Sequence, residues 1–261
     1  GAGEVAGDDP MRKAGDTVDL REKSLGYADE PSAATKQGNA LSKKTMAKLT
    51  KEQKGAVAWY RDGGYRGINN SLRTGKEQPD LLEQQRKDWG VAYTNKQAIE
   101  HLDSVLSKAA LDKPIAVYRG IRESVDAERL RKMQVGDAVQ DSGFLSTSLS
   151  PQSAYWSFAY GHKHSGVLVR IELPKGFHAA YISGKEGVEN EVLLQRNSTF
   201  EIHAMSKKTD ERGKEYQEIT LRPRQKVENA KSDLVVYPLI TEEDETRGFK
   251  EPAEASPEGA T

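Results

Sequence analysis

Three short motifs carry side chains that can act on a nucleotide or a sugar. Arg119 stands at the end of an expected strand, where its planar guanidinium can bind phosphate through two parallel charge-assisted hydrogen bonds. Ser146, Thr147 and Ser148 place three hydroxyls in a row, and extended backbone would turn Ser146 and Ser148 to one side and Thr147 to the other. Both motifs also have an ordinary explanation, because strand-end arginines are usually solvated and strand hydroxyls usually pair across a sheet.

The third motif is a pair of carboxylates, Glu189 and Glu191, separated by one residue. Strand alternation would place both on one side, directly after the glycine-bearing loop 183–188. Like charges repel, although charge runs on solvated faces are frequent. The apolar run 192–194 follows at once, so the pair lies where a buried strand emerges, a position at which functional carboxylates are often held.

Strands must position all three motifs. From residue 115 onward the pattern has period two and is rich in β-branched residues. Ser150 followed by Pro151 predicts the start of a short helix that reaches Tyr160. The strands expected from the pattern are 115–119, 144–148, 167–173, 178–182, 191–195, 199–205 and 216–222.

The chain from about residue 45 to residue 114 is predicted to be helical. A T-x-x-Q capping box occurs at 50–53 and again at 94–97, each ahead of apolar residues at helical spacing. We expect the glycines in 62–64 to end the first helix and a second helix to cover 65–74, with Gly75 after its end. Helices followed by a strand-rich half indicate an α+β fold.

Composition narrows the class of protein. The 261 residues include 39 Lys and Arg against 40 Asp and Glu, and this balance offers no bulk attraction for nucleic acid or an anionic membrane. Since there is no cysteine, disulfides, thiolate zinc sites and a cysteine nucleophile are excluded. No apolar run approaches the roughly 20 residues that span a bilayer, so we expect no membrane insertion.

The two ends of the chain are poor in clustered apolar residues. We expect a flexible leader over 1–44, a folded catalytic unit over 45–240 and a flexible acidic tail over 241–261. The chain begins without Met, from which we expect a processed fragment or a module of a longer protein.

In their order, the motifs resemble the R-S-E family of ADP-ribosyltransferases. The Ser-Thr-Ser motif begins 27 residues after Arg119, and the Glu-x-Glu motif begins 43 residues after Ser146. The segment 64–73 looks like the Gly-Tyr-x-x-Ile-Asn-x-x-Leu-Arg element of the exoenzyme branch, which includes bacterial toxins, effectors and domains fused to phage head proteins. The likeness runs from about 49 to 222 and implies N-terminal helices packed on a two-sheet β core.

The resemblance also implies NAD as co-substrate and a role for each motif. Glu191 would hydrogen-bond the ribose 2′-hydroxyl and stabilise an oxocarbenium-like centre, Arg119 would hold the pyrophosphate, and Ser146 would orient Glu191. Thr147 and Ser148 would support the strand and the nicotinamide pocket. The implied NAD-binding residues are Tyr65, Asn69, Arg119, Gly120, Ser146, Thr147, Ser148 and Glu191.

Glu189 would position and activate the acceptor, and in the family Glu-x-Glu goes with arginine acceptors. A carboxylate can orient an arginine guanidinium and take its proton. The loop 183–188 would contact the target. We therefore expect a host protein as partner, such as actin or a small GTPase, and a monomeric enzyme that is secreted or delivered to act in the host cytosol.

One segment departs from the family pattern. No arginine lies between Ser148 and Arg170, where the family often carries an aromatic residue and an arginine. Trp156, Phe158 or Tyr160 can stack on nicotinamide, and Lys163 or a histidine can replace the phosphate contact, although ordinary helix packing explains most of these aromatics.

Other functions fit the same residues. Water in place of the acceptor would make the protein an NAD glycohydrolase, and loss of turnover would leave a non-catalytic binding module. The histidines 162 and 164 lack a third ligand at metal-binding spacing, so we expect no metal. There is no G-x-x-x-x-G-K-[ST] and no G-x-G-x-x-G, so NAD is not expected on a Rossmann fold.

Overall fold

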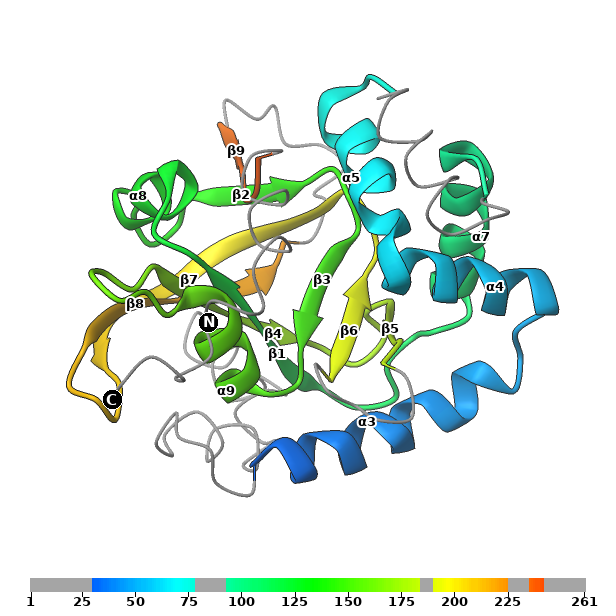
Figure 1. The fold of residues 1–261 in the computed structure, drawn as a ribbon, viewed down its shortest axis with the longest axis horizontal. Coiled ribbons are helices and arrows are strands. Elements are labelled where there is room, and N and C mark those ends of the chain that lie inside the picture. Colours follow the sequence, from blue (N-terminus) through cyan, green and yellow to red (C-terminus); the bar gives the residue numbers. More distant parts are fainter. Residues whose placement is uncertain (1–29, 78–92, 184–189, 225–234, 242–261) are drawn as a thin grey trace, which may run out of the picture.

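The computed structural model describes residues 30–77, 93–183, 190–224 and 235–241 (Figure 1). Its helices are α3 (Glu30–Met46), α4 (Lys51–Trp59), α5 (Tyr65–Thr74), α7 (Asn95–Ser107), α8 (Val125–Arg131) and α9 (Pro151–Ala154), with π-helical turns η1 (Tyr60–Gly64) and η2 (Tyr155–Ala159). Its strands are β1 (Ile115–Ile121), β2 (Ala138–Asp141), β3 (Leu145–Ser148), β4 (Val167–Leu173), β5 (Ala179–Tyr181), β6 (Glu191–Leu194), β7 (Ser198–Thr209), β8 (Glu215–Pro223) and β9 (Val236–Pro238). None of the described helices has the length and apolar composition to cross a membrane. The α+β class is as expected.

The described strands form one ladder in the order β5-β6-β3-β1-β4-β8-β7-β2-β9. A single residue pair, Tyr118 with Ser148, joins β3 to β1, so the ladder has two parts that meet at one point. Apolar side chains of both parts share one core, for example Val192 of β6 with Val117 and Val169 of the larger part. The two-sheet core implied by the family is therefore one continuous ladder whose parts diverge between β3 and β1.

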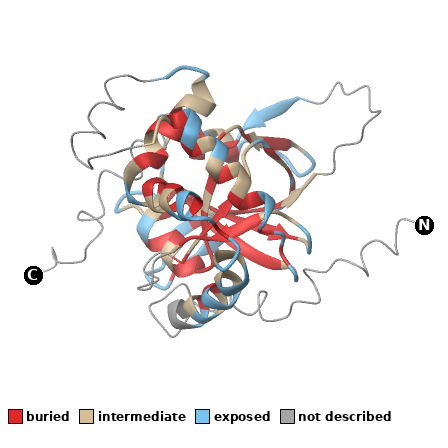
Figure 2. Ribbon diagram, turned by 90° about the vertical axis from the view of Figure 1, so that its right-hand side faces the viewer, coloured by how far each residue is buried: buried red, intermediate tan, exposed pale blue. Residues whose placement is uncertain are grey.

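A second core fixes the helices to the smaller part of the ladder. Val57, Tyr60, Ile68 and Leu102 pack with Leu193 of β6, and full burial of one such side chain contributes about 1.5–3 kcal/mol. Figure 1 shows α4, α5 and α7 beside β3 and β6, and Figure 2 shows buried residues concentrated on the strands and the inner helix faces. The helices are thus held against the strands that carry two of the three motifs.

The predicted helix starts are confirmed. Thr50 and Thr94 each accept a hydrogen bond from the backbone of a glutamine three residues later, and that glutamine bonds back to the cap. The helix end expected at 62–64 is present as a kink, because Gly63 adopts a non-helical φ of 151° between α4 and α5. Gly75 ends α5 in the left-handed conformation, as expected.

The folded part begins earlier than the boundary expected at residue 45. Helix α3 starts at Glu30, and Ala34 is fully buried in the main core. At Gly38 a Cβ would lie 2.2 Å from the ring of Tyr181, so the helix approaches β5 closely. Small residues make this contact, and they leave no apolar stripe in the sequence. The ranges 1–29 and 242–261 lie outside the described residues.

The seven expected strands are present with ends shifted by a few residues, and the Ser150 cap with its helical segment is confirmed. The elements α8, β2 and β9 were not anticipated. Their sequences are short, with strands of four and three residues, and β9 pairs with β2 at the far edge of the ladder. Periodicity over so few residues is too weak to identify an element.

Candidate active site

The arginine, the first serine and the second glutamate of the three motifs emerge from neighbouring strands. Arg119 is the one residue of β1 that is not buried, Ser146 is the one in β3, and Glu191 is the one in β6. The three strands are adjacent in the order β6-β3-β1. A guanidinium, a hydroxyl and a carboxylate therefore reach the surface side by side from otherwise buried backbone.

Arg119 connects β1 with β3, the two strands at which the parts of the ladder diverge. Its Nη1 donates a hydrogen bond to the backbone carbonyl of Ser146 at 2.9 Å. A guanidinium carries five N–H groups in a fixed plane, so this bond orients the whole group. The guanidinium is thereby held beside the Ser-Thr-Ser strand.

Ser146 is linked to the helices through Tyr60. The Ser146 Oγ lies 2.7 Å from the Tyr60 hydroxyl, which accepts a hydrogen bond from Asn69 Nδ2 at 3.0 Å. Asn69 Oδ1 in turn accepts from the backbone N–H of Phe144 at 2.9 Å. Asn69 is fully buried, and both ends of its amide hold protein groups in place. No pattern in the sequence indicates the hydrogen bond between Tyr60 and Ser146.

The neighbouring hydroxyls, those of Thr147 and Ser148, form hydrogen bonds with backbone groups. Thr147 donates to the backbone carbonyl of Val192 at 2.6 Å, and Ser148 accepts from the backbone N–H of Ser150 at 3.0 Å. Both residues are buried. They fix β3 against β6 and against the start of α9.

Glu191 begins β6 directly opposite Ser148. Its backbone N–H donates to Ser183 Oγ at 2.6 Å, which ties the start of β6 to the end of β5. Asn190, the residue between the two glutamates, has a φ of 48°, and β6 starts only at Glu191. Glu189 lies outside the described residues.

Tyr65 and Gly120 lie at the edges of this arrangement. Tyr65 stacks edge-on against Tyr60, with ring centroids 6.1 Å apart, and its hydroxyl accepts a hydrogen bond from Arg66 at 3.2 Å. At Gly120 a Cβ would lie 2.0 Å from the carbonyl oxygen of Ala154. The glycine therefore lets the helical segment that follows Ser-Thr-Ser lie directly on β1.

The aromatic segment that includes Trp156, Phe158 and Tyr160 meets a cation from elsewhere in the chain. Trp156 and Tyr160 lie with ring centroids 5.0 Å apart, and Phe158 is half-buried. The guanidinium of Arg212, from the turn between β7 and β8, lies 5.0 Å from the Trp156 ring and 5.3 Å from the Tyr160 ring. A positive charge therefore flanks the segment, although the segment itself has no arginine.

An ion pair that sequence reasoning missed holds α5 to the turn before β3. Arg73 donates from Nε and Nη2 to the two carboxylate oxygens of Asp141 at 2.9 and 2.8 Å. Asp141 also accepts from the backbone N–H of Gly143 at 2.9 Å. The pair thereby helps to position β3. In the sequence, only the arginine that ends the motif at 64–73 points to this contact.

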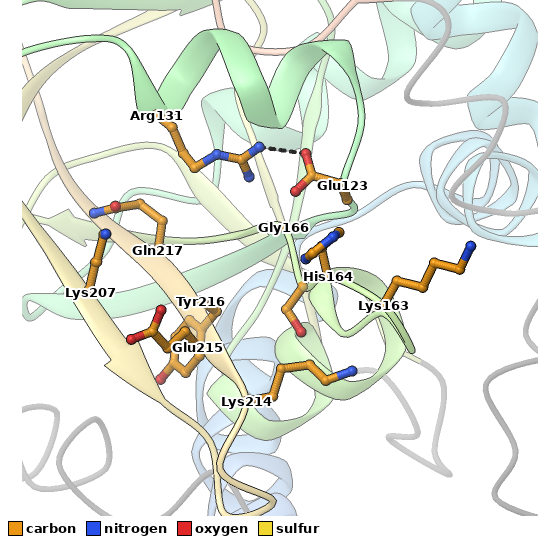
Figure 3. A pocket seen from close by; sticks show the side chains of 11 residues that line it. Glu123, Arg131, Lys163, His164, Gly166, Lys207, Lys214, Glu215, Tyr216 and Gln217 are labelled. Carbon is orange, nitrogen blue, oxygen red and sulfur yellow. Dashed lines mark hydrogen bonds and ion pairs between the residues drawn. The ribbon is translucent and has the colours of Figure 1, made fainter.

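Figure 3 shows a cavity of about 360 Å³ whose lining residues do not include Arg119, Ser146 or Glu191. Glu123 and Arg131 pair on one of its walls at 2.5 Å, and Lys214 donates to the carbonyl of Gly161 at 2.7 Å. Its lining residues are Glu123, Arg131, Lys163, His164, Ser165, Gly166, Lys207, Lys214, Glu215, Tyr216 and Gln217. Within the described ranges no group of three potential metal ligands occurs.

An α+β fold in which arginine, serine and glutamate emerge from adjoining strands defines the class of ADP-ribosyltransferases. The model of the ADP-ribosyltransferase exoenzyme family matches residues 34–225, so the chain belongs to that family. A search of curated proteins found no match. The chain is therefore an ADP-ribosyltransferase of the toxin family that uses NAD as co-substrate and acts on protein substrates.

Solved structures of bacterial toxins share the fold. Vis toxin from Vibrio splendidus has a TM-score of 0.58 at 20% identity, covering 85% of this chain and 96% of its own. Plx2a from Paenibacillus larvae has a TM-score of 0.53 at 21% identity, covering 75% and 96%. BECa of a C. perfringens binary enterotoxin, solved with NADH, has a TM-score of 0.60 at 19% identity, covering 77% of this chain and 50% of its own.

Proposed function

We propose that the enzyme transfers ADP-ribose from NAD to an arginine side chain of a protein in another cell. The observation that carries the proposal is the joint emergence of Arg119, Ser146 and Glu191 from three adjacent, otherwise buried strands. Such a set combines an anion-binding group with a carboxylate, as the splitting of a dinucleotide at a ribose requires.

In the proposed reaction Arg119 binds the NAD pyrophosphate, and Gly120 lets the helical segment 151–159 lie directly on β1 beside it. The bond between ribose C1′ and nicotinamide breaks, and its electron pair leaves with nicotinamide. Positive charge then develops on the ribose, and Glu191 stabilises it while bonding the 2′-hydroxyl. Ser146 orients Glu191, with Thr147 and Ser148 behind it. From α5, Tyr65 borders the NAD site, and buried Asn69 supports it indirectly through Tyr60 and Ser146.

The proposed acceptor is a guanidinium. One of its nitrogens forms the new bond to C1′, and the proton that it loses passes to Glu189. An arginine is protonated at all ordinary pH values and is a poor nucleophile, so a nearby carboxylate is needed to orient and deprotonate it. A structure of Vis toxin was solved in complex with agmatine, a small molecule that carries a guanidine group, which supports this choice.

Agmatine provides a direct test. Incubation of the enzyme with NAD and agmatine should yield ADP-ribosyl-agmatine and one equivalent of nicotinamide. The variant Glu189→Ala should lose transfer while still releasing nicotinamide, whereas Glu201→Ala, which removes an exposed carboxylate on β7, should retain both. Nicotinamide release by the native enzyme without any transfer would favour an NAD glycohydrolase, and no effect of Glu189→Ala would refute its role.

We further propose that the enzyme is a monomer, is secreted or delivered, and modifies a protein in the host cytosol. Labelled NAD added to host lysate should mark a discrete protein, and mass spectrometry of that protein should locate the modified arginine. Labelling confined to another residue type would refute the arginine assignment. A Glu191→Ala variant with full biological effect would instead indicate a non-catalytic binding module.

A further inference from the structure

The residue between the two glutamates is the most constrained part of the motif. Asn190 is fully buried, with 0% of its surface exposed, although it stands between two charged residues. Its φ of 48° lies in the left-handed region, which asparagine tolerates better than most residues other than glycine. Such a conformation persists only where surrounding contacts hold it.

Backbone hydrogen bonds fix this turn from two neighbouring elements. The carbonyl of Asn190 accepts from the N–H of Leu149, just after β3, at 3.0 Å. The next residue, Glu191, donates to Ser183 Oγ at 2.6 Å and accepts from the N–H of Ile182 at 2.9 Å. The backbone of both residues is therefore bound to the ends of β3 and β5.

The Asn190 side chain adds an anchor to α3. Thr35 Oγ1 on α3 and the Tyr181 hydroxyl on β5 both donate to Asn190 Oδ1, each at 3.0 Å. Burial raises the pKa of Tyr181, so its phenol stays protonated as a donor. The close contact of Gly38 with the Tyr181 ring keeps α3 against this point. A helix 155 residues away in sequence thus reaches the turn that carries Glu191.

We propose that Asn190, held by Thr35 and Tyr181, is a positioning residue that sets where the Glu191 carboxylate lies. This inference rests on the proposed role of Glu191. Asparagine suits the position because it tolerates a positive φ and because its side-chain oxygen can accept hydrogen bonds from two donors. Misplacement of a reacting group by about 1 Å can lower a rate a hundredfold, so this anchor would affect bond cleavage more than NAD binding.

The test removes the donors while the backbone remains able to adopt the turn. The double variant Thr35→Val/Tyr181→Phe leaves Asn190 Oδ1 without these two bonds at nearly constant shape. Its kcat for NAD cleavage should fall about tenfold to a hundredfold while its KM for NAD changes less than about twofold. Asn190→Gly, which keeps access to a positive φ but loses the side chain, should behave alike. Thr45→Val on the same helix is the matched control.

Rescue separates positioning from general stability. Thr35→Ser keeps a hydroxyl that can donate to Asn190 and should have native kcat, whereas Thr35→Val removes the donor and should have a lower kcat. Circular dichroism should show that both variants are folded. The pH dependence of kcat should shift in the double variant, because a displaced Glu191 meets different surroundings, and should not shift in Thr45→Val. Native kcat in the double variant, or a loss of kcat matched by an equal rise in KM, would overturn the inference.

A parallel Glu191→Gln variant separates this inference from the proposed function. If Glu191→Gln retains activity, the proposed role of Glu191 fails and the positioning role fails with it. If Glu191→Gln is inactive while the double variant keeps native kcat, only the positioning role fails. If the double variant fails to fold, the comparison of Thr35→Val with Thr35→Ser decides, since each alters one partly buried side chain.

Discussion

The hydroxyl of Tyr60 lies 2.7 Å from the Oγ of Ser146 and joins the kink between α4 and α5 to the middle of β3. The Tyr60 hydroxyl accepts a hydrogen bond from Asn69 and forms a second one with Ser146, in which either hydroxyl can be the donor. The chain Asn69, Tyr60, Ser146 therefore carries the position of the helices into the strand that holds the central serine. Buried networks of this kind specify one arrangement when every member is satisfied.

Tyr60→Phe should weaken both the fold and the reaction. Loss of the bonds to Ser146 and Asn69 should lower the free energy of unfolding by about 1–3 kcal/mol, because buried Asn69 loses a partner. The kcat for ADP-ribose transfer should fall about tenfold, since Ser146 loses one of its constraints. Denaturant unfolding and steady-state kinetics measure the two effects. Tyr93→Phe, whose hydroxyl bonds an exposed backbone carbonyl, is the control and should change neither.

Glu191→Gln should abolish turnover and leave the fold intact. Glutamine keeps the shape of the side chain but removes the negative charge, so the rates of nicotinamide release and of transfer should both fall about a hundredfold to a thousandfold. The side chain is half-exposed, and the melting temperature should change little. The exposed-carboxylate variant Glu201→Gln should keep native rates. A Glu191→Gln enzyme that still releases nicotinamide would contradict the role assigned to the charge.

Much of the fold was predictable because its signals are local. The capping boxes at Thr50 and Thr94 involve residues three apart, and the strands show β-branched residues at period two. The order of Arg119, Ser146 and Glu191 identified the strands that meet at the site. In each case the information lies within one element, or in the sequence order of elements.

Contacts between distant segments were not predictable in the same way. Helix α3 buries Ala34 and uses Gly38 to approach Tyr181, and neither residue type shows an amphipathic pattern. The positive φ of Asn190 is accompanied by hydrogen bonds from α3 and β5, and nothing within the Glu-x-Glu motif indicates these partners. Arg212 reaches the aromatic segment only because the turn between β7 and β8 folds over it.

Breaking the buried ion pair between Arg73 and Asp141 should destabilise the protein strongly. The two side chains are 5% and 1% exposed, and removal of one partner leaves an uncompensated buried charge. Arg73→Met should therefore cost about 3–5 kcal/mol of unfolding free energy. Urea denaturation of the variants measures the cost.

A second substitution should recover part of that loss. In Arg73→Met/Asp141→Asn the lone charge is gone, while the amide oxygen of the new asparagine can still accept from Gly143. The double variant should therefore be more stable than Arg73→Met alone. If the double variant is the less stable of the two, the explanation by an uncompensated charge is wrong.

Alkaline pH should destabilise the protein through Tyr155. This tyrosine is fully buried, and its hydroxyl bonds Asp210 and Ser165. Burial raises the pKa of Tyr155 above its ordinary value, and the hydrogen bond to Asp210 raises it further. An unfolded tyrosine ionises near pH 10, so the folded state binds the proton more tightly than the unfolded state does. The contribution of protonated Tyr155 to the free energy of unfolding is therefore complete below about pH 10. It is lost as the pH rises toward the higher pKa of the folded state.

Tyr155→Phe should therefore flatten the fall in unfolding free energy above about pH 10, because phenylalanine has no proton to lose. Burial also raises the pKa of Tyr181, so the slope should decrease without vanishing. Tyr237→Phe alters an exposed phenol on β9 and should leave the slope as in the native enzyme. Chemical denaturation at a series of pH values measures the slopes. An unchanged slope in Tyr155→Phe would show that the buried phenol does not resist ionisation, and the alkaline loss would then have to arise elsewhere in the molecule.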